Sequence, residues 1–94
     1  MATAAKTVYP HITTDPGVCH GRPCIAGTRV RVMDVVAAHE QGISPEDLQD
    51  YFATRRLTLA EIYAALAYYD DHRSEVEGDF EEAERAAAGR RPGS

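Results

Sequence analysis

The spacing of apolar residues predicts a first helix over residues 32–41. Val32, Val35, Val36 and His39 recur at i, i+3, i+4 and i+7, which places them on one face of a helix. Gly42 follows this run directly, and glycine most readily adopts the left-handed conformation that ends many helices. The first helix is therefore expected to end just before Gly42.

Capping residues indicate two further helix starts. Ser44 precedes a proline at the first helical position, and Asp47 stands three residues after this cap. Thr58 is followed at the same spacing by Glu61, which makes a full capping box. A short second helix, a turn and a longer third helix are therefore predicted, in helix-turn-helix proportions. Each start also carries a hydrophobic staple: Ile43 with Leu48, and Leu57 with Ile62.

A short β-hairpin is predicted ahead of these helices. Residues 28–32 alternate with period two, so their valines would share one face and Arg29 and Arg31 the other. The preceding Ala26-Gly27 suits a two-residue turn. Residues 8–12 form another candidate strand, which the proline within it confines to a sheet edge. The expected fold class is mainly α, with a three-helix helix-turn-helix bundle behind a short β-hairpin.

The chain after residue 69 is acidic and predicts a helical C-terminal tail. Gly78 is expected to interrupt helix, and residues 81–88, rich in Glu, Arg and Ala, favour a loosely held final helix. The expected organisation is a flexible N-terminus over residues 1–7, a single domain over 8–76 and an acidic helical or disordered tail over 77–94. We favour a solvated tail over a partner-binding segment. The second interpretation stays open because Val76 and Phe80, four residues apart, form an apolar anchor pair.

The formal net charge of −5 is distributed unevenly along the chain. Residues 1–56 contain six basic and six acidic side chains, whereas residues 57–94 contain four Arg and nine acidic residues. A protein that bound DNA by overall charge would be much more basic, so DNA contact would require a local patch. The alternative is that Arg29 and Arg31 are solvated strand residues or pair with the acidic tail. The candidate nucleic-acid-binding residues are Arg22, Arg29, Arg31, Arg55 and Arg56.

The predicted third helix is poorly equipped to read bases. Its first turn carries Leu59, Ala60 and Glu61, and its outward positions include Tyr63 and Ala64. None of these is an Arg, Asn or Gln that would contact a purine edge with two hydrogen bonds. Glu61 would also repel phosphate. This helix is therefore expected to serve protein contact rather than base readout.

Several function classes are disfavoured by the sequence. No apolar run approaches the roughly 20 residues that span a bilayer, and the start lacks a signal-peptide core, so we expect a cytoplasmic protein. Cys19, His20 and Cys24, with His11, supply only part of a zinc site, and each Cys is ordinarily a small buried hydrophobe. No nucleophile-base spacing or phosphate-binding loop is present. We expect no catalysis, no metal and no cofactor, and a homodimer, because a domain this small gains stability by dimerising.

Residues 12–80 resemble family 433 of the domains of unknown function. The resemblance is carried by Ile12-Thr13-Thr14-Asp15-Pro16, by residues 21–30 (GRPCIAGTRV), by Gly42-Ile43-Ser44 and by residues 57–66 (LTLAEIYAAL). It implies a homeodomain-like three-helix fold that is usually dimeric. It also implies antitoxin behaviour and frequent operon pairing with a nuclease-like toxin of the PIN type. This chain departs from the family in having His20 where many members carry Gly, and in the link formed by residues 53–56.

The resemblance and the charge distribution together predict an antitoxin-type interaction module that neutralises a nuclease-like toxin. In this interpretation the acidic segment from Asp70 to Glu84 engages a basic active-site rim of the toxin or supplies carboxylates near its metal. The alternative is a DNA-binding autorepressor that contacts operator DNA through its helix-turn-helix and its arginines. The candidate partner-binding residues are Asp70, Asp71, Glu75, Val76 and Phe80.

Overall fold

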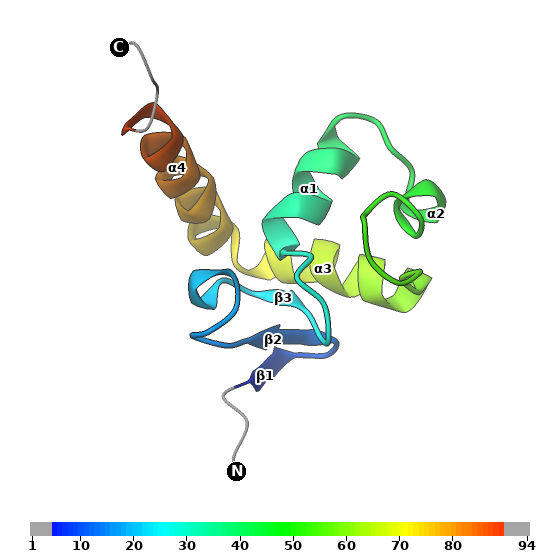
Figure 1. Ribbon diagram of the computed structural model, residues 1–94. Coiled ribbons are helices and arrows are strands. Elements are labelled where there is room, and N and C mark those ends of the chain that lie inside the picture. Colours follow the sequence, from blue (N-terminus) through cyan, green and yellow to red (C-terminus); the bar gives the residue numbers. More distant parts are fainter. Residues whose placement is uncertain (1–4, 90–94) are drawn as a thin grey trace.

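The computed structural model describes residues 5–89, in which a small antiparallel sheet leads into four helices (Figure 1). The mainly helical class predicted from the sequence is confirmed. Residues 1–4 and 90–94, at the ends of the predicted N-terminus and tail, lie outside the described residues. Among the described helices, none has the length and apolar character needed to cross a membrane. The elements are β1 (Lys6–Tyr9), β2 (Ile12–Thr14), a 3-10 turn η1 (Cys19–Gly21), β3 (Cys24–Ile25), α1 (Val32–Glu40), α2 (Pro45–Leu48), α3 (Leu59–Asp71) and α4 (Arg73–Gly89).

The sheet has the strand order β1-β2-β3, with both pairs antiparallel. The prediction of one strand over residues 8–12 is wrong, because the chain turns at Pro10 and His11 and begins β2 at Ile12. Pro10 has no N–H to donate, and His11 adopts a left-handed φ of 68°. Ile12 pairs with Ile25 in the neighbouring strand, and both side chains are fully buried.

The strand predicted over residues 28–32 is wrong for its first half, because the chain still turns at Thr28 and Arg29 and pairs with β3 only around Arg31. The Thr28 hydroxyl donates to the carbonyl of Ile25 at 2.9 Å and accepts the backbone N–H of Val30 at 3.1 Å. Arg31 forms an isolated antiparallel bridge to Cys24, in which Ile25 N–H donates to the Val30 carbonyl and Val32 N–H donates to the Pro23 carbonyl, both at 2.9 Å. The expected sidedness nevertheless holds for Val30, which is buried, and Arg29, which is exposed.

The helix starts predicted from capping residues are confirmed. The Ser44 hydroxyl accepts the backbone N–H of Asp47 at 3.2 Å at the start of α2. At the start of α3, the Thr58 hydroxyl accepts the N–H of Glu61 at 3.1 Å, and the Glu61 carboxylate accepts the N–H of Thr58 at 2.9 Å. These reciprocal bonds satisfy backbone donors that a helix start leaves free.

The break expected at Gly78 lies instead at His72, between α3 and α4. His72 has non-helical backbone angles, φ −132° and ψ 45°, whereas α4 continues through Gly78. The prediction of an interruption at Gly78 is therefore wrong. A Cβ at Gly78 would meet no neighbouring atom within 4 Å, which is consistent with an ordinary exposed helical position.

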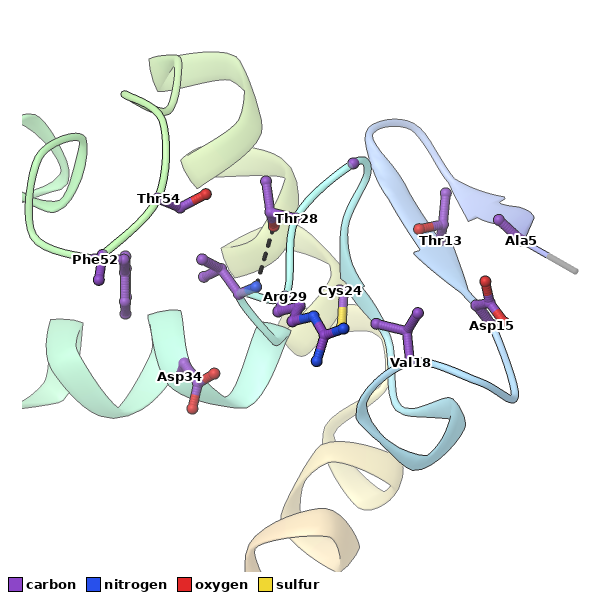
Figure 2. Close-up of a pocket in the computed structure, with 13 residues that line it drawn as sticks. Ala5, Thr13, Asp15, Val18, Cys24, Thr28, Arg29, Asp34, Phe52 and Thr54 are labelled. Atoms are coloured by element: carbon purple, nitrogen blue, oxygen red, sulfur yellow. Dashed lines mark hydrogen bonds between the residues drawn. The ribbon is translucent and has the colours of Figure 1, made fainter. Parts of the chain in front are cut away.

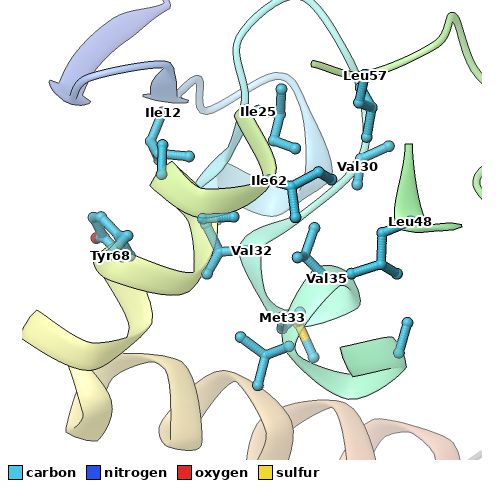
Figure 3. Packing of buried hydrophobic residues seen from close by; sticks show 14 of the residues in the cluster. Ile12, Ile25, Val30, Val32, Met33, Val35, Leu48, Leu57, Ile62 and Tyr68 are labelled. Atoms are coloured by element: carbon cyan, nitrogen blue, oxygen red, sulfur yellow. The ribbon is translucent and has the colours of Figure 1, made fainter. Parts of the chain in front are cut away.

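α3 lies between the sheet and α1, and its buried face joins the two (Figure 1). The hydrophobic core gathers where β2, β3, α1 and α3 meet (Figure 3). α4 extends the core at one edge, since Val76 is fully buried and Phe80 and Ala83 pack against the cluster. The rest of α4 extends away from the body of the domain (Figure 1). The largest fully buried side chains are Ile12, Ile25, Leu48, Leu57, Ile62, Val32, Val35, Val36 and Val76.

Candidate interaction surfaces

Arg31 lies at the N-cap of α1 and forms an ion pair with Asp34. Its Nε and Nη2 donate to the two carboxylate oxygens of Asp34 at 3.0 and 2.9 Å. The backbone N–H of Arg31 also donates to Asp34 at 3.0 Å. Because the fork of the guanidinium matches the carboxylate, this pair fixes Arg31 against its own helix rather than presenting it to solvent.

Arg55 and Arg56 stand in the link between α2 and α3, and both are paired within the domain. Arg55 donates to both carboxylate oxygens of Glu61, at 2.9 and 2.7 Å, and to the carbonyl of Ala26 at 3.2 Å. The Arg55 guanidinium lowers the pKa of Glu61 to about 2, and the backbone N–H of Thr58 adds to this effect against the raising effect of burial. Arg56 forms an exposed ion pair with Asp50, with 3.4 Å between Nη1 and Oδ2.

Arg29 is the candidate arginine for which residues 5–89 contain no ion-pair partner. It lines an open groove of about 620 Å³ between the sheet and the α2–α3 link (Figure 2). Val18, Val30 and Phe52 give this groove an apolar lining. A cation with no internal partner beside apolar side chains is available to an external anion.

Arg22 is paired across the longest sequence separation of these arginines. Its Nη2 donates to Glu82 of α4 at 2.6 Å, and its Nε lies 3.7 Å from Oδ1 of Asp79. The second distance is too long for a hydrogen bond, and the buried Nε has no acceptor among the described residues. The Arg22 side chain is only 13% exposed, so α4 largely covers it.

The five candidate arginines do not form one patch. Arg22 and Arg31 line a second groove, of about 480 Å³, together with His20 and the α4 residues Glu82, Ala83 and Ala86. Arg29 lines the other groove, and Arg55 and Arg56 lie at the α2–α3 link. The pairing between Arg22 and α4 was not predicted from the sequence, where pairing with the acidic tail was considered only for Arg29 and Arg31. No local pattern connects residues about 60 positions apart.

The predicted partner-binding residues lie at the α3–α4 junction, and most already have contacts. Asp71 accepts the Tyr9 hydroxyl at 3.0 Å, and Glu75 accepts the Tyr68 hydroxyl at 2.7 Å. Asp70 pairs with Arg73 at 3.3 Å. Val76 is fully buried and Phe80 is partly buried, so both hold α4 to the domain.

An aromatic cluster fixes the same junction. The His72 ring stacks on Tyr68 with 4.2 Å between centroids, and Tyr9 meets Tyr68 edge-on at 5.5 Å. Burial and the hydrogen bond to Glu75 raise the pKa of Tyr68, while burial also raises the pKa of Asp79. These effects indicate that the start of α4 is partly withdrawn from water.

Outside this junction, α4 presents carboxylates that the domain does not use. Glu81 and Glu84 are exposed and have no hydrogen bond or ion pair within the described part of the chain. The α4 segment as a whole carries six acidic residues and two arginines. Its outer face is therefore a strongly negative surface on a helix anchored through Val76.

Of the cysteines and histidines named as partial zinc ligands, Cys19 and Cys24 lie next to each other. Within residues 5–89, no three His, Cys, Asp or Glu side chains are grouped in a way that would hold a metal ion. Cys24 is buried, and its thiol lies 3.4 Å from the carbonyl of Arg22. Burial first, and then the neighbouring Cys19 thiol, raise the pKa of Cys24 to about 12.

Comparisons with known proteins agree with the resemblance seen in the sequence. A family model described as "Protein of unknown function (DUF433)" matches residues 12–69, more than half of the chain. The crystal structure of a DUF433 member protein from Anabaena variabilis is similar, with 30% sequence identity and a TM-score of 0.66. The similarity covers 73% of this chain and 66% of that one. No protein of curated function matches the chain. The family match and this structural likeness show that the chain belongs to the DUF433 family of proteins of unknown function.

Proposed function

We propose that this chain is a non-enzymatic, cytoplasmic antitoxin-type module that binds a basic protein partner through α4. The observation that carries the proposal is the outer face of α4, where Glu81 and Glu84 are exposed and have no partner among residues 5–89. Complementary charge raises association rates and selects partners. The family resemblance described above identifies the expected partner as a nuclease-like toxin of the PIN type.

The anchoring of α4 supports this use. A binding helix that is already folded loses less conformational entropy on association than one that must first order itself. Val76 and Phe80 attach α4 to the core, and the Arg22–Glu82 bond adds a further attachment two residues beyond Phe80. The free carboxylates therefore follow directly on the part of α4 that is anchored to the core.

Capture of the partner tests the proposal. The chain is co-expressed with the product of the neighbouring gene and recovered by a tag on either protein. A complex is expected that weakens about tenfold in the double variant Glu81→Gln/Glu84→Gln and weakens further as salt is raised. The matched control, Glu40→Gln/Glu46→Gln, removes two exposed charges from α1 and α2 and should leave binding unchanged. Failure to form a complex, together with no rescue of growth from the neighbouring gene's toxicity, would refute the proposal.

A homodimer is part of the same proposal. β1 is an edge strand with largely exposed side chains, and a domain of this size gains stability from a second copy. Sedimentation of the purified chain at micromolar concentration should give twice the monomer mass. A monomer over the whole concentration range would remove the dimer from the proposal.

The second candidate function is DNA-binding autorepression by a homeodomain-like helix-turn-helix formed by α2, the link and α3. The observation that favours it is Arg29, which is exposed and has no ion-pair partner in the described chain. Arg56 adds a mostly exposed guanidinium at the link before α3. Contacts of this kind neutralise phosphates and make binding depend steeply on salt.

A gel shift on DNA from upstream of the gene tests this second candidate. Binding should appear at low salt, weaken as salt rises, and be reduced in Arg29→Gln/Arg56→Gln. The control Arg73→Gln removes an arginine from the start of α4 and should leave the shift intact. A shift that does not respond to salt, or none at low salt, would exclude this function.

A further inference from the structure

The groove between η1 and α4 contains Arg22, an arginine whose opposite charges come from outside the family-matched segment. Arg22 and Arg31 line it from one side, together with His20. Arg31 is neutralised locally by Asp34, whereas Arg22 depends on Asp79 and Glu82 of α4. α4 begins at Arg73, beyond residue 69 where the family match ends. The family-matched part of the chain therefore carries a cationic surface that α4 covers.

The acidic residues of α4 satisfy the hydrogen-bond donors of Arg22 incompletely. Glu82 occupies Nη2 at 2.6 Å, but Asp79 stands 3.7 Å from Nε, which is buried without an acceptor among the described residues. A guanidinium is best satisfied when one anion accepts from two of its nitrogens in parallel. A phosphate group has enough oxygens to do this, and the side-by-side carboxylates of α4 do not achieve it.

The end of α4 is the part of this helix that separates most easily from the rest of the domain. Beyond Phe80, only Ala83 packs against the hydrophobic cluster, and most side chains up to Ala88 are exposed. Helix ends with few buried contacts open at low free-energy cost. Unwinding from Glu81 onward would free Arg22 from Glu82 and leave Val76 in the core.

We propose that the end of α4 is a releasable acidic cover over a phosphate-binding surface centred on Arg22, with His20 and the Asp34-paired Arg31 beside it, whose ligand is the backbone of duplex DNA. This inference rests on the second candidate function and assigns its regulation. The covered state holds the carboxylate of Glu82 where a backbone phosphate binds in the open state. DNA and α4 therefore compete for the same guanidinium.

Matched charge-removing variants of the full chain test this competition. Binding to a labelled 20-base-pair duplex of mixed sequence is measured across a salt series for wild type, Asp79→Asn/Glu82→Gln and Glu81→Gln/Glu84→Gln. Each double variant removes two negative charges from α4, but only the first pair contacts Arg22. The first variant should bind about tenfold more tightly than the second at low salt, with a salt slope steeper by about 0.9 for the added phosphate contact.

Two further measurements separate the possible outcomes. Adding Arg22→Gln to Asp79→Asn/Glu82→Gln should abolish the gain while circular dichroism shows unchanged helix content. In the Asp79→Asn/Glu82→Gln protein, the Nε–H resonance of Arg22 should shift on addition of duplex. Equal affinities of the two double variants would overturn the cover, while salt-dependent binding of wild type would still support DNA contact. A response to inorganic phosphate with no gain in duplex affinity would also overturn the inference.

Discussion

Arg55 donates hydrogen bonds to Glu61 from both terminal nitrogens, at 2.9 Å from Nη1 to Oε1 and 2.7 Å from Nη2 to Oε2. The same Oε1 accepts the backbone N–H of Thr58, so one carboxylate closes the capping box and anchors the link before α3. Glu61→Gln removes the charge while keeping the size of the side chain. It should lower the free energy of unfolding by about 1 to 2 kcal/mol, measured by urea denaturation. Glu84→Gln, at an exposed and unpaired position, is the control and should change stability little.

The stability contributed by Glu61 should disappear in acid. The folded protein lowers the pKa of this carboxyl from 4.5 to about 2. A lowered pKa stabilises the folded state above the unfolded pKa, and that contribution is lost as pH falls through the folded value. The stability difference between wild type and Glu61→Gln should therefore be constant near neutral pH and shrink between pH 4.5 and 2. A difference that stays constant through this range would contradict the assignment.

Two glycines should respond to alanine with opposite signs. Gly42 ends α1 with φ +99°, a conformation that strains any residue with a Cβ, although the space around it is open. Gly42→Ala should lower the unfolding free energy by about 1 kcal/mol. Gly78 lies inside α4 without a positive φ, so Gly78→Ala should raise it by about 0.5 to 1 kcal/mol. Thermal denaturation of both variants measures the contrast, and equal signs would contradict it.

The two cysteines should differ in reactivity. Cys24 is buried with its pKa raised to about 12, so almost no thiolate exists at pH 8. Cys19 is only partly buried. Iodoacetamide should therefore alkylate Cys19 first, as read by peptide mass spectrometry, and Cys24 should react only as urea unfolds the chain. In Cys19→Ser, native-state alkylation should fall at least about tenfold. Rapid native labelling of Cys24 would show that its surroundings are more open than described.

Local chemistry explains which features were predictable from the sequence. The Ser44 and Thr58 hydroxyls accept hydrogen bonds from backbone N–H groups three residues later. The helix starts that they cap can therefore be predicted from short stretches of sequence. Gly42 ends α1 for an equally local reason. The strand predicted over residues 28–32 failed because the Thr28 hydroxyl closes a turn. The two hydrogen bonds of this hydroxyl outweighed the alternation of side chains at the start of the segment.

The candidate surfaces depended on contacts that no short stretch encodes. The sequence identified the arginines and the acidic tail, but their partners were decided by tertiary structure. Arg22 donates a hydrogen bond to Glu82, 60 positions away in the sequence, whereas Arg31 donates to Asp34, only three residues away. Arg29, which the alternation paired with Arg31 on one face, ended in a different groove.

The burial of Val76 separates two ways of drawing the boundary of this protein. The family match stops at residue 69, yet a side chain seven positions later belongs to the hydrophobic core. The hydrophobic core therefore extends beyond the family-matched residues. A relative with a different C-terminal segment needs another apolar group to cover the surface of α1 and α3 that Val76 covers here. The family-matched segment and the unit that must fold together end at different residues.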